Sequence, residues 1–158
     1  MVAKRVPKST KRARRQEGPS EVAPGVFVGG WKDATDFSGA KFCVLDEQPP
    51  DMPAAMHIPI YDESTDAPIP SNLNRLAAEI LSARDRNEPV LVFCGHGIRR
   101  APLGGAWYLH RSQEITLDEA FDRVIEVRPG VERVQTWAKG WKVLDEGKTA
   151  SARSPRKR

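Results

Sequence analysis

The sequence predicts an α/β domain with a small, central and mostly parallel sheet flanked by helices. The first observation is segment 90–93, a continuous run of four apolar residues that is typical of a strand buried on both faces of a sheet. The second is the order of the segments, because the expected strands lie mostly ahead of the expected helices. That order is typical of helices packed on a small sheet.

Three further strands are expected ahead of segment 90–93. Residues 26–28 are β-formers that stop at two glycines, and residues 41–45 form a second run of the same kind. Three prolines between residues 49 and 53 mark a loop. Residues 56–60 form the last of the three strands.

The helix that precedes the central strand is expected to begin with Ser71, a common N-cap residue. Its apolar residues recur at helical spacing and define one buried face. They are Leu73, Leu76, Ala77, Ile80 and Leu81. Pro89 ends the turn that leads from this helix to the strand.

Three helices are expected after the central strand. The first covers residues 101–111, with Pro102 in its first turn, where proline is tolerated. Thr116 and Glu119 form a capping box that starts the second, and a Pro-Gly pair ends it. Its expected buried face consists of Leu117, Ala120, Phe121, Val124 and Ile125. The third is expected over residues 131–144.

Positive charge gathers at both ends of the chain. Residues 1–20 carry a net charge of +6 and residues 148–158 one of +5, so the net charge of +4 leaves −7 for the middle. Both ends are expected to be disordered basic tails around one domain over residues 21–147, which starts near Val22. Such tails bind nucleic acid or another polyanion in some proteins and serve only solubility in others.

The composition argues against several classes of protein. No segment approaches the roughly 18 apolar residues of a membrane helix, and no apolar run follows the basic N-terminus as in a secretory signal. Two cysteines are too few for a disulfide framework, so a reducing, cytoplasmic setting is expected. No His/Cys spacing suggests a zinc site, and no metal is expected.

The segment after the central strand has the residues of an anion-binding loop. Cys94 stands where the strand ends, and a helix follows about six residues later. Gly95 and Gly97 permit a curled backbone whose N–H groups converge, and the helix N-terminus adds partial positive charge. Arg100 can place its planar fork on two phosphate oxygens. The positive field favours the nucleophilic thiolate of Cys94.

The rest of the loop is expected to contact the substrate. His96, Ile98 and Arg99, together with the two glycines, would line the bound phosphate. His96 could equally face solvent. Arg99 could contact an acidic flank of the substrate or form a surface salt bridge.

Phosphoryl transfer also needs an acid for the leaving oxygen. Asp62 ends the expected third strand, and the flexible segment after it would let its carboxyl swing over the phosphate. Asp66 is the alternative, and Glu63 is the third candidate.

The run VLVFCGHGIRRAPLGGAWYL is similar to the active-site strand, loop and helix of dual-specificity phosphatases, a branch of the protein tyrosine phosphatase superfamily. The family pattern is Cys, five residues and Arg, with Gly at the third of the five, and Cys94, Gly97 and Arg100 match it. Asp62 lies 32 residues before Cys94, a spacing typical of the family's general acid. The segments GVFVGGWKDATDF and ITLDEAFDRVIEVRPGV look like the family's opening strand and helix and its late helix with an Arg-Pro turn.

The resemblance implies a protein tyrosine phosphatase-like fold and a reaction in two stages without a cofactor. Cys94 would attack phosphorus while Asp62 protonates the leaving oxygen, and water activated by Asp62 would then cleave the phosphocysteine. The implied substrates are phosphorylated proteins that carry phosphotyrosine, and also phosphoserine or phosphothreonine. Cys43 lies on an expected strand as a core residue, and its oxidation to a disulfide with Cys94 is a further hypothesis.

Two residues depart from the family pattern. Phe93 stands where the family has a His, and Ala101 where it has a hydroxyl that assists hydrolysis of the phosphoenzyme. The second stage is therefore expected to be slower by about one or two orders of magnitude, if the hydroxyl acts like a single oxyanion donor. Three other functions stay open. They are a weakly active or inactive phosphate-binding module, an RNA 5′-phosphatase that uses the basic tails, and a rhodanese-like sulfurtransferase that would not need Asp62.

Overall fold

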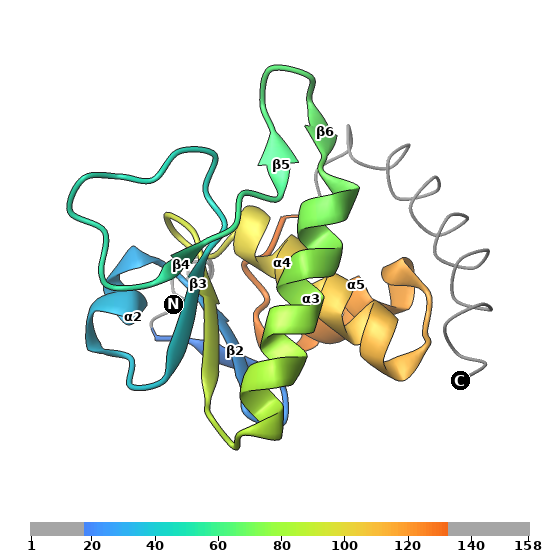
Figure 1. The fold of residues 1–158 in the computed structure, drawn as a ribbon. Helices are drawn as coiled ribbons and strands as arrows, with labels where there is room; N and C mark the ends of the chain where they lie inside the picture. The colour runs from blue at the N-terminus through green and yellow to red at the C-terminus, as the bar shows by residue number, and fades with distance from the viewer. Residues whose placement is uncertain (1–17, 133–158) are drawn as a thin grey trace, which may run out of the picture.

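The computed structural model describes residues 18–132 of the chain (Figure 1). The basic tails lie almost wholly outside the described residues, as does the helix expected over residues 131–144, so these stay predictions. Within residues 18–132, no helix combines the length and the apolar character needed to cross a membrane.

Five strands form the main sheet, in the spatial order β1-β2-β7-β3-β4. In that order they span Ser20–Ala23, Val26–Gly29, Val90–Phe93, Ala40–Cys43 and Met56–His57. The central strand β7 pairs in parallel with β2 and β3, β3 pairs in parallel with β4, and β1 pairs antiparallel with β2. The expected α/β fold with a mostly parallel sheet is therefore confirmed.

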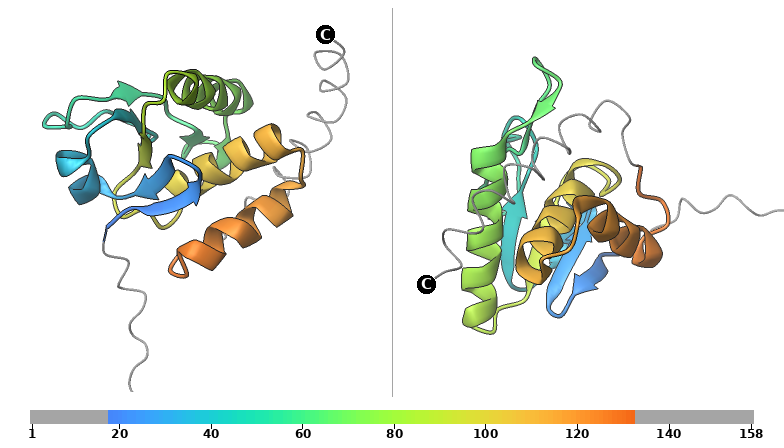
Figure 2. Two further views of the ribbon diagram at one scale, coloured as in Figure 1. Left: turned by 90° about the horizontal axis from the view of Figure 1, so that it is seen from below. Right: turned by 90° about the vertical axis from the view of Figure 1, so that its right-hand side faces the viewer.

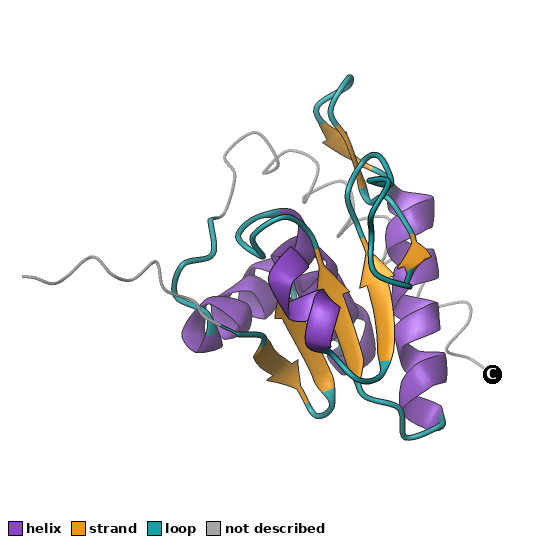
Figure 3. Ribbon diagram, turned by 90° about the vertical axis from the view of Figure 1, so that its left-hand side faces the viewer, coloured by secondary structure: helices purple, strands orange, loops and turns teal. Residues whose placement is uncertain are grey.

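Both faces of β7 are covered, which explains why its four residues are all buried. Figure 3 shows α2 (Trp31–Asp36) against one face of the sheet and the other helices on the opposite side. Leu91 and Phe93 pack on the α2 side, whereas Val90 and Val92 join the core on the other side. Side chains alternate across a strand, so a strand covered on both faces is apolar at every position.

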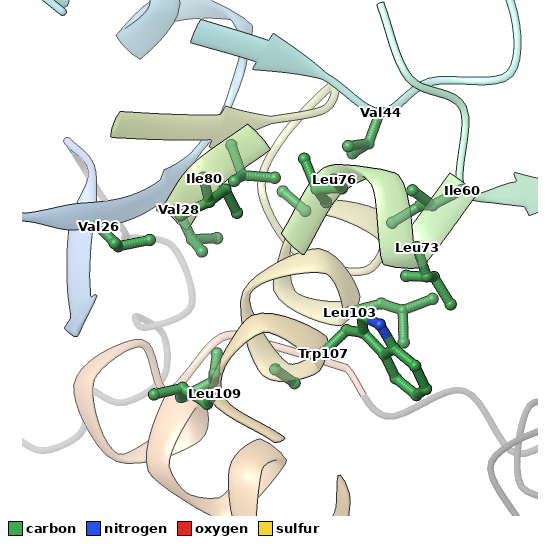
Figure 4. Close-up of a cluster of buried hydrophobic side chains, with 14 of the residues drawn as sticks. Val26, Val28, Val44, Ile60, Leu73, Leu76, Ile80, Leu103, Trp107 and Leu109 are labelled. Atoms are coloured by element: carbon green, nitrogen blue, oxygen red, sulfur yellow. The ribbon is translucent and has the colours of Figure 1, made fainter. Parts of the chain in front are cut away.

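The main core lies between the sheet and three longer helices. These are α3 (Pro70–Asp85), α4 (Arg100–Gln113) and α5 (Leu117–Val127). Figure 4 shows Leu73 and Leu76 of α3 beside Leu103 and Trp107 of α4, all at most 2% exposed. Full burial of each such leucine contributes about 2 kcal/mol. The helix α5 packs alongside α4 (Figure 2), so α4 contacts α3, α5 and the sheet.

The start of α3 differs from the expectation. The N-cap is Ile69 rather than Ser71, and no side chain caps the helix. Pro70 occupies the first helical position, where its fixed φ already suits a helix and its missing N–H costs nothing. Ser71 therefore lies inside the first turn.

The buried face of α3 is mostly as expected, because Leu73, Leu76 and Ile80 are fully buried. Leu81 was expected on the same face but is 51% exposed. It lies about 100° around the helix from Ile80, which turns it to solvent, and Ala83 extends the buried face instead.

The two later helices are close to the expectation. α4 begins at Arg100, with Pro102 in its first turn. The capping box of α5 is present, with the Glu119 N–H donating to Thr116 Oγ1 over 3.1 Å and the Thr116 N–H donating to Glu119 Oε1 over 3.2 Å. The expected buried face is confirmed except at Ile125, which is half-buried.

The strand expected over residues 56–60 is shorter in the structure. β4 ends at His57, one residue before Ile58, whose N–H still donates to the Cys43 carbonyl over 2.8 Å. The chain then forms β5 (Tyr61–Asp62), which pairs antiparallel with β6 (Ala67–Pro68) in a separate hairpin. Figure 1 shows this hairpin projecting beyond the end of the sheet, near the start of α3. All three candidate acids belong to it.

The edge strand β1 was not expected. It begins at Ser20, two residues ahead of the predicted domain start at Val22. Gly25, with φ +76°, allows the tight turn that joins β1 to β2.

Candidate active site

The loop from Cys94 to Arg100 joins the centre of the sheet to the start of α4. β7 ends at Phe93 and α4 begins at Arg100, so the loop lies at the carboxyl edge of the parallel strands. Open α/β sheets bind their ligands at this edge. The expected strand, loop and helix are therefore present.

Hydrogen bonds from outside the loop fix the direction of its peptide groups. Four successive loop carbonyls accept hydrogen bonds over 2.8 to 3.3 Å. The Gly95 carbonyl accepts from the Trp31 N–H, and the Ile98 carbonyl accepts from the Glu132 N–H. Between them, the His96 carbonyl accepts from Arg128 Nη2 and the Gly97 carbonyl from Arg128 Nε. The C=O and N–H of a trans peptide point in opposite directions. The N–H groups of residues 96–99 therefore point away from these partners, as a cradle for an anion requires.

Gly97 is a glycine for steric reasons. Its φ is +71°, and a Cβ there would lie 2.7 Å from the backbone of Gly29 and 2.8 Å from Arg128 Nη2. Gly30 serves the same packing, since a Cβ on it would lie 2.9 Å from the carbonyl oxygen of Gly95. Glycine at both positions therefore lets the loop pack closely against the end of β2 and the N-cap of α2.

Cys94 is 5% exposed and lies next to the first turn of α4. The Ala101 N–H donates to its Sγ over 3.3 Å. An N–H at a helix N-terminus stabilises negative charge on the acceptor that it faces. The sulfur is therefore placed as a nucleophile would be.

A cavity of about 230 Å³ opens over this loop. It is lined by Leu45, Cys94, Gly95, His96, Ile98, Arg99, Arg100 and Glu132. This volume is below the 300–1,000 Å³ or so of pockets for drug-sized ligands, and it suits a phosphate group with a small part of its ester. Six of the predicted site residues are brought together here, whereas Gly97 and Asp62 do not line the cavity.

Arg100 lies at the boundary between this cavity and a second one of about 280 Å³. Its Nη2 forms an ion pair with Glu63, and its Nε lies 3.6 Å from Asp46 Oδ1. The guanidinium carbon lies 6.0 Å from the centroid of the Tyr61 ring. Acidic and aromatic neighbours thus hold the fork of Arg100 at the edge of the loop.

The three candidate acids have different partners in the β5–β6 hairpin. Asp62 Oδ1 accepts from the Ser64 N–H over 2.9 Å and from the Ser64 hydroxyl over 2.7 Å, and these bonds hold the pKa of Asp62 below its usual value. Asp66 accepts a hydrogen bond from the Tyr61 hydroxyl. Glu63 is the one of the three that pairs with Arg100.

Arg128 belongs to the site but was not singled out from the sequence. It is 1% exposed, and besides the two loop carbonyls its Nη1 donates to the Gly18 carbonyl over 3.0 Å and to Ser20 Oγ over 2.9 Å. Burial lowers its pKa, while the charges of Asp33 and Cys94 raise it. The only sequence signal for a role of Arg128 was its place in the Arg-Pro turn. Its contact with Gly97 joins residues 31 positions apart, and such a contact leaves no local sequence pattern.

Phe93 and Cys43 lie on the face of the sheet that α2 covers. Phe93 is fully buried, and its ring meets that of Trp31 edge to face, with centroids 6.3 Å apart. Cys43 is a buried free thiol, as expected of a core residue, and burial is the main cause that raises its pKa. Cys94 is also a free thiol, so a disulfide between the two stays a prediction.

The fold is that of an α/β protein in which a Cys-to-Arg loop joins the central strand of a mostly parallel sheet to a helix. The family model described as the dual specificity phosphatase catalytic domain matches residues 46–139, more than half of the chain. The chain therefore belongs to the dual-specificity phosphatases of the protein tyrosine phosphatase superfamily. It is a hydrolase that acts on phosphorylated substrates.

Solved structures of low sequence identity share this fold. A variant of human DUSP28 is 23% identical, with a TM-score of 0.73 over 85% of this chain and 99% of the other. A mouse dual-specificity phosphatase solved with zinc tungstate is 24% identical, with a TM-score of 0.70 over 94% and 97% of the two chains. The human tyrosine phosphatase-like serine/threonine/tyrosine-interacting protein is 16% identical, with a TM-score of 0.67 over 87% and 99%. No curated protein matches the chain.

Proposed function

We propose that the protein is a cysteine-dependent phosphatase that hydrolyses phosphotyrosine, and also phosphoserine and phosphothreonine, through a phosphocysteine intermediate. The observation that carries this proposal is the position of Cys94. Its sulfur lines a cavity of phosphate size, accepts the Ala101 N–H at a helix N-terminus, and shares the cavity with Arg100.

In the first stage, Cys94 Sγ attacks the phosphorus of the bound monoester. The N–H groups of residues 96–99 and the Arg100 fork hold the nonbridging oxygens while the P–O ester bond breaks. Asp62 donates its proton to the leaving oxygen. Because Asp62 does not line the cavity, this step requires the β5–β6 hairpin to move toward the bound phosphate.

In the second stage, water attacks the phosphocysteine and the S–P bond breaks. The Asp62 carboxylate accepts the proton of the water, and orthophosphate and the Cys94 thiolate are released. Ala101 offers its backbone N–H to the sulfur but no hydroxyl. We therefore expect this stage to limit the rate.

The shallow site supports activity on several phosphorylated side chains. A cavity of about 230 Å³ with an exposed His96 and Arg99 at its rim leaves the phosphate of a short side chain within reach of Cys94. A reducing, cytoplasmic setting suits a mechanism that depends on a free thiol. Binding of a polyanion by the basic tails remains a separate proposal.

Hydrolysis of three phosphopeptides tests the proposal. The peptides share one sequence and differ only in the phosphorylated residue, which is phosphotyrosine, phosphoserine or phosphothreonine. Wild type should release phosphate from all three, and Cys94→Ser from none. Cys43→Ser is the matched control, because it alters the other buried thiol. Phosphate release that survives in Cys94→Ser would disprove the cysteine mechanism, and release from phosphotyrosine alone would disprove the broader specificity.

A further inference from the structure

The fork of Arg100 is already in use before a substrate arrives. Its side chain is 19% exposed, its Nη2 pairs with Glu63, and its Nε faces Asp46 at 3.6 Å. That longer distance leaves Arg100 Nε and Asp46 Oδ1 buried without a hydrogen-bond partner among the described residues. The pairing with Glu63 is therefore the stronger hold on the guanidinium.

Glu63 is placed so that it can leave. It lies in the turn between β5 and β6, and its side chain is 61% exposed. Releasing Arg100 would return this carboxylate to water without opening the core. Arg100, by contrast, begins α4 and rests beside the buried Tyr61, so it stays where it is.

A carboxylate and a phosphate compete for the same donors of an arginine. The planar guanidinium binds two oxygens side by side, and both groups present that geometry. Arg100 borders the cavity that contains Cys94 on one side and the cavity that contains Glu63 on the other. Nη2 already donates to Glu63, so a phosphate that takes Nη2 as one of its two donors must share that group with the carboxylate.

We propose that Glu63 is an internal competitor of the substrate phosphate for Arg100, and so sets the affinity of the site for phosphate. This inference rests on the proposed function, in which Arg100 holds the phosphate. Phosphate binding displaces Glu63 from the fork, and it thereby frees the turn that also contains Asp62. A dianionic phosphate displaces the carboxylate more readily than a singly charged anion does, because its charge is greater.

The expected effect is modest, since an exposed ion pair contributes no more than about 1 kcal/mol, or roughly fivefold in affinity. Glu63→Gln should therefore tighten orthophosphate binding by about threefold to fivefold. Removal of any negative charge near the site would also strengthen the binding of an anion, whether or not that charge pairs with Arg100. Glu47→Gln is the matched control for this general charge effect, because Glu47 lines the cavity that contains Glu63. Among the described residues, the carboxylates paired with Arg100 are those of Asp46 and Glu63.

Titration calorimetry of the full chain with inorganic phosphate measures the affinities without turnover. The competition predicts tighter binding by Glu63→Gln than by Glu47→Gln, with a difference that shrinks at high salt. Equal affinities for the two variants would overturn the competition while leaving the phosphate site intact. If the folded wild type bound no phosphate at all, the proposed phosphate site would fail, and this inference with it.

Discussion

The Nε of Arg128 lies 2.9 Å from the carbonyl oxygen of Gly97, and this contact ties the end of α5 to the middle of the Cys94–Arg100 loop. The same guanidinium also reaches the segment ahead of β1 through the Gly18 carbonyl. Three parts of the chain that are far apart in sequence thus meet at one buried cation. Arg128 thus holds two carbonyls of the loop, although it does not line the cavity.

Arg128→Met is expected to lower both stability and anion affinity. The change leaves buried carbonyls without donors, which costs on the order of 3 kcal/mol of unfolding free energy. In the folded protein, vanadate affinity should fall at least about tenfold, because the loop N–H groups lose their fixed direction. The measurements are urea unfolding and vanadate titration well below the midpoint. Arg123→Met, which removes an exposed arginine of α5, is the control. Unchanged vanadate affinity in the folded Arg128→Met protein would contradict the positioning role.

Ser64→Ala is expected to move the alkaline limb of the pH profile upward. Asp62 must be protonated to donate to the leaving oxygen, so kcat/KM falls as the pH rises through the pKa of Asp62. The Ser64 hydroxyl is the main cause that holds this pKa low. Removing it raises the pKa, so the fall begins at higher pH. The check is the pH dependence of kcat/KM for one aryl phosphate. Thr65→Val removes a smaller contribution and should shift the limb less. A limb that stays in place in Ser64→Ala would exclude Asp62 as its source.

Ala101→Ser is expected to speed the second stage. The backbone N–H of residue 101 already donates to the Cys94 sulfur. A serine at this position would add a hydroxyl one atom beyond its Cβ. A single donor to the departing thiolate is worth about tenfold to a hundredfold. The steady-state turnover rate should rise, while the rate of the first stage changes little. Rapid-quench kinetics can measure the two rates separately. Ala106→Ser places a hydroxyl at another buried site of α4 and should leave turnover unchanged. An unchanged steady-state rate in Ala101→Ser would mean that hydrolysis of the phosphocysteine is not the slow step.

The two thiols are expected to react very differently with iodoacetamide. Cys94 lines the cavity, whereas Cys43 is fully buried and its pKa is raised by that burial, so it carries little thiolate at neutral pH. Mass spectrometry of the folded protein should find one label, at Cys94, and inorganic phosphate should slow its addition. Labelling of Cys43 at a similar rate would show that the α2 side of the sheet opens.

Local patterns were enough to predict the strand, loop and helix around Cys94. The apolar run of β7, the positive φ of Gly97 and the proline in the first turn of α4 are features of the local backbone, and the structure has them in place. The capping box of Thr116 and Glu119 is local in the same way.

Features that depend on tertiary contacts could not be predicted. Arg128 joins the site through partners 31 and 110 residues away, so no spacing along the chain announces it. Which hairpin carboxylate pairs with Arg100 depends on the direction of a turn, and adjacent residues such as Asp62 and Glu63 point in different directions there. The early end of β4 also differs from the expectation, because the apolar run over residues 56–60 continues past the two residues that pair with β3.

Trapping the phosphocysteine tests the central claim most directly. The full chain is mixed with an excess of p-nitrophenyl phosphate, quenched in acid within the first turnover, and digested for mass spectrometry. We predict a phosphoryl group on Cys94, a burst of nitrophenol that matches its amount, and neither in Cys94→Ser. Nitrophenol released by the wild type without phosphate on Cys94 at any time, and released equally by Cys94→Ser, would contradict the account.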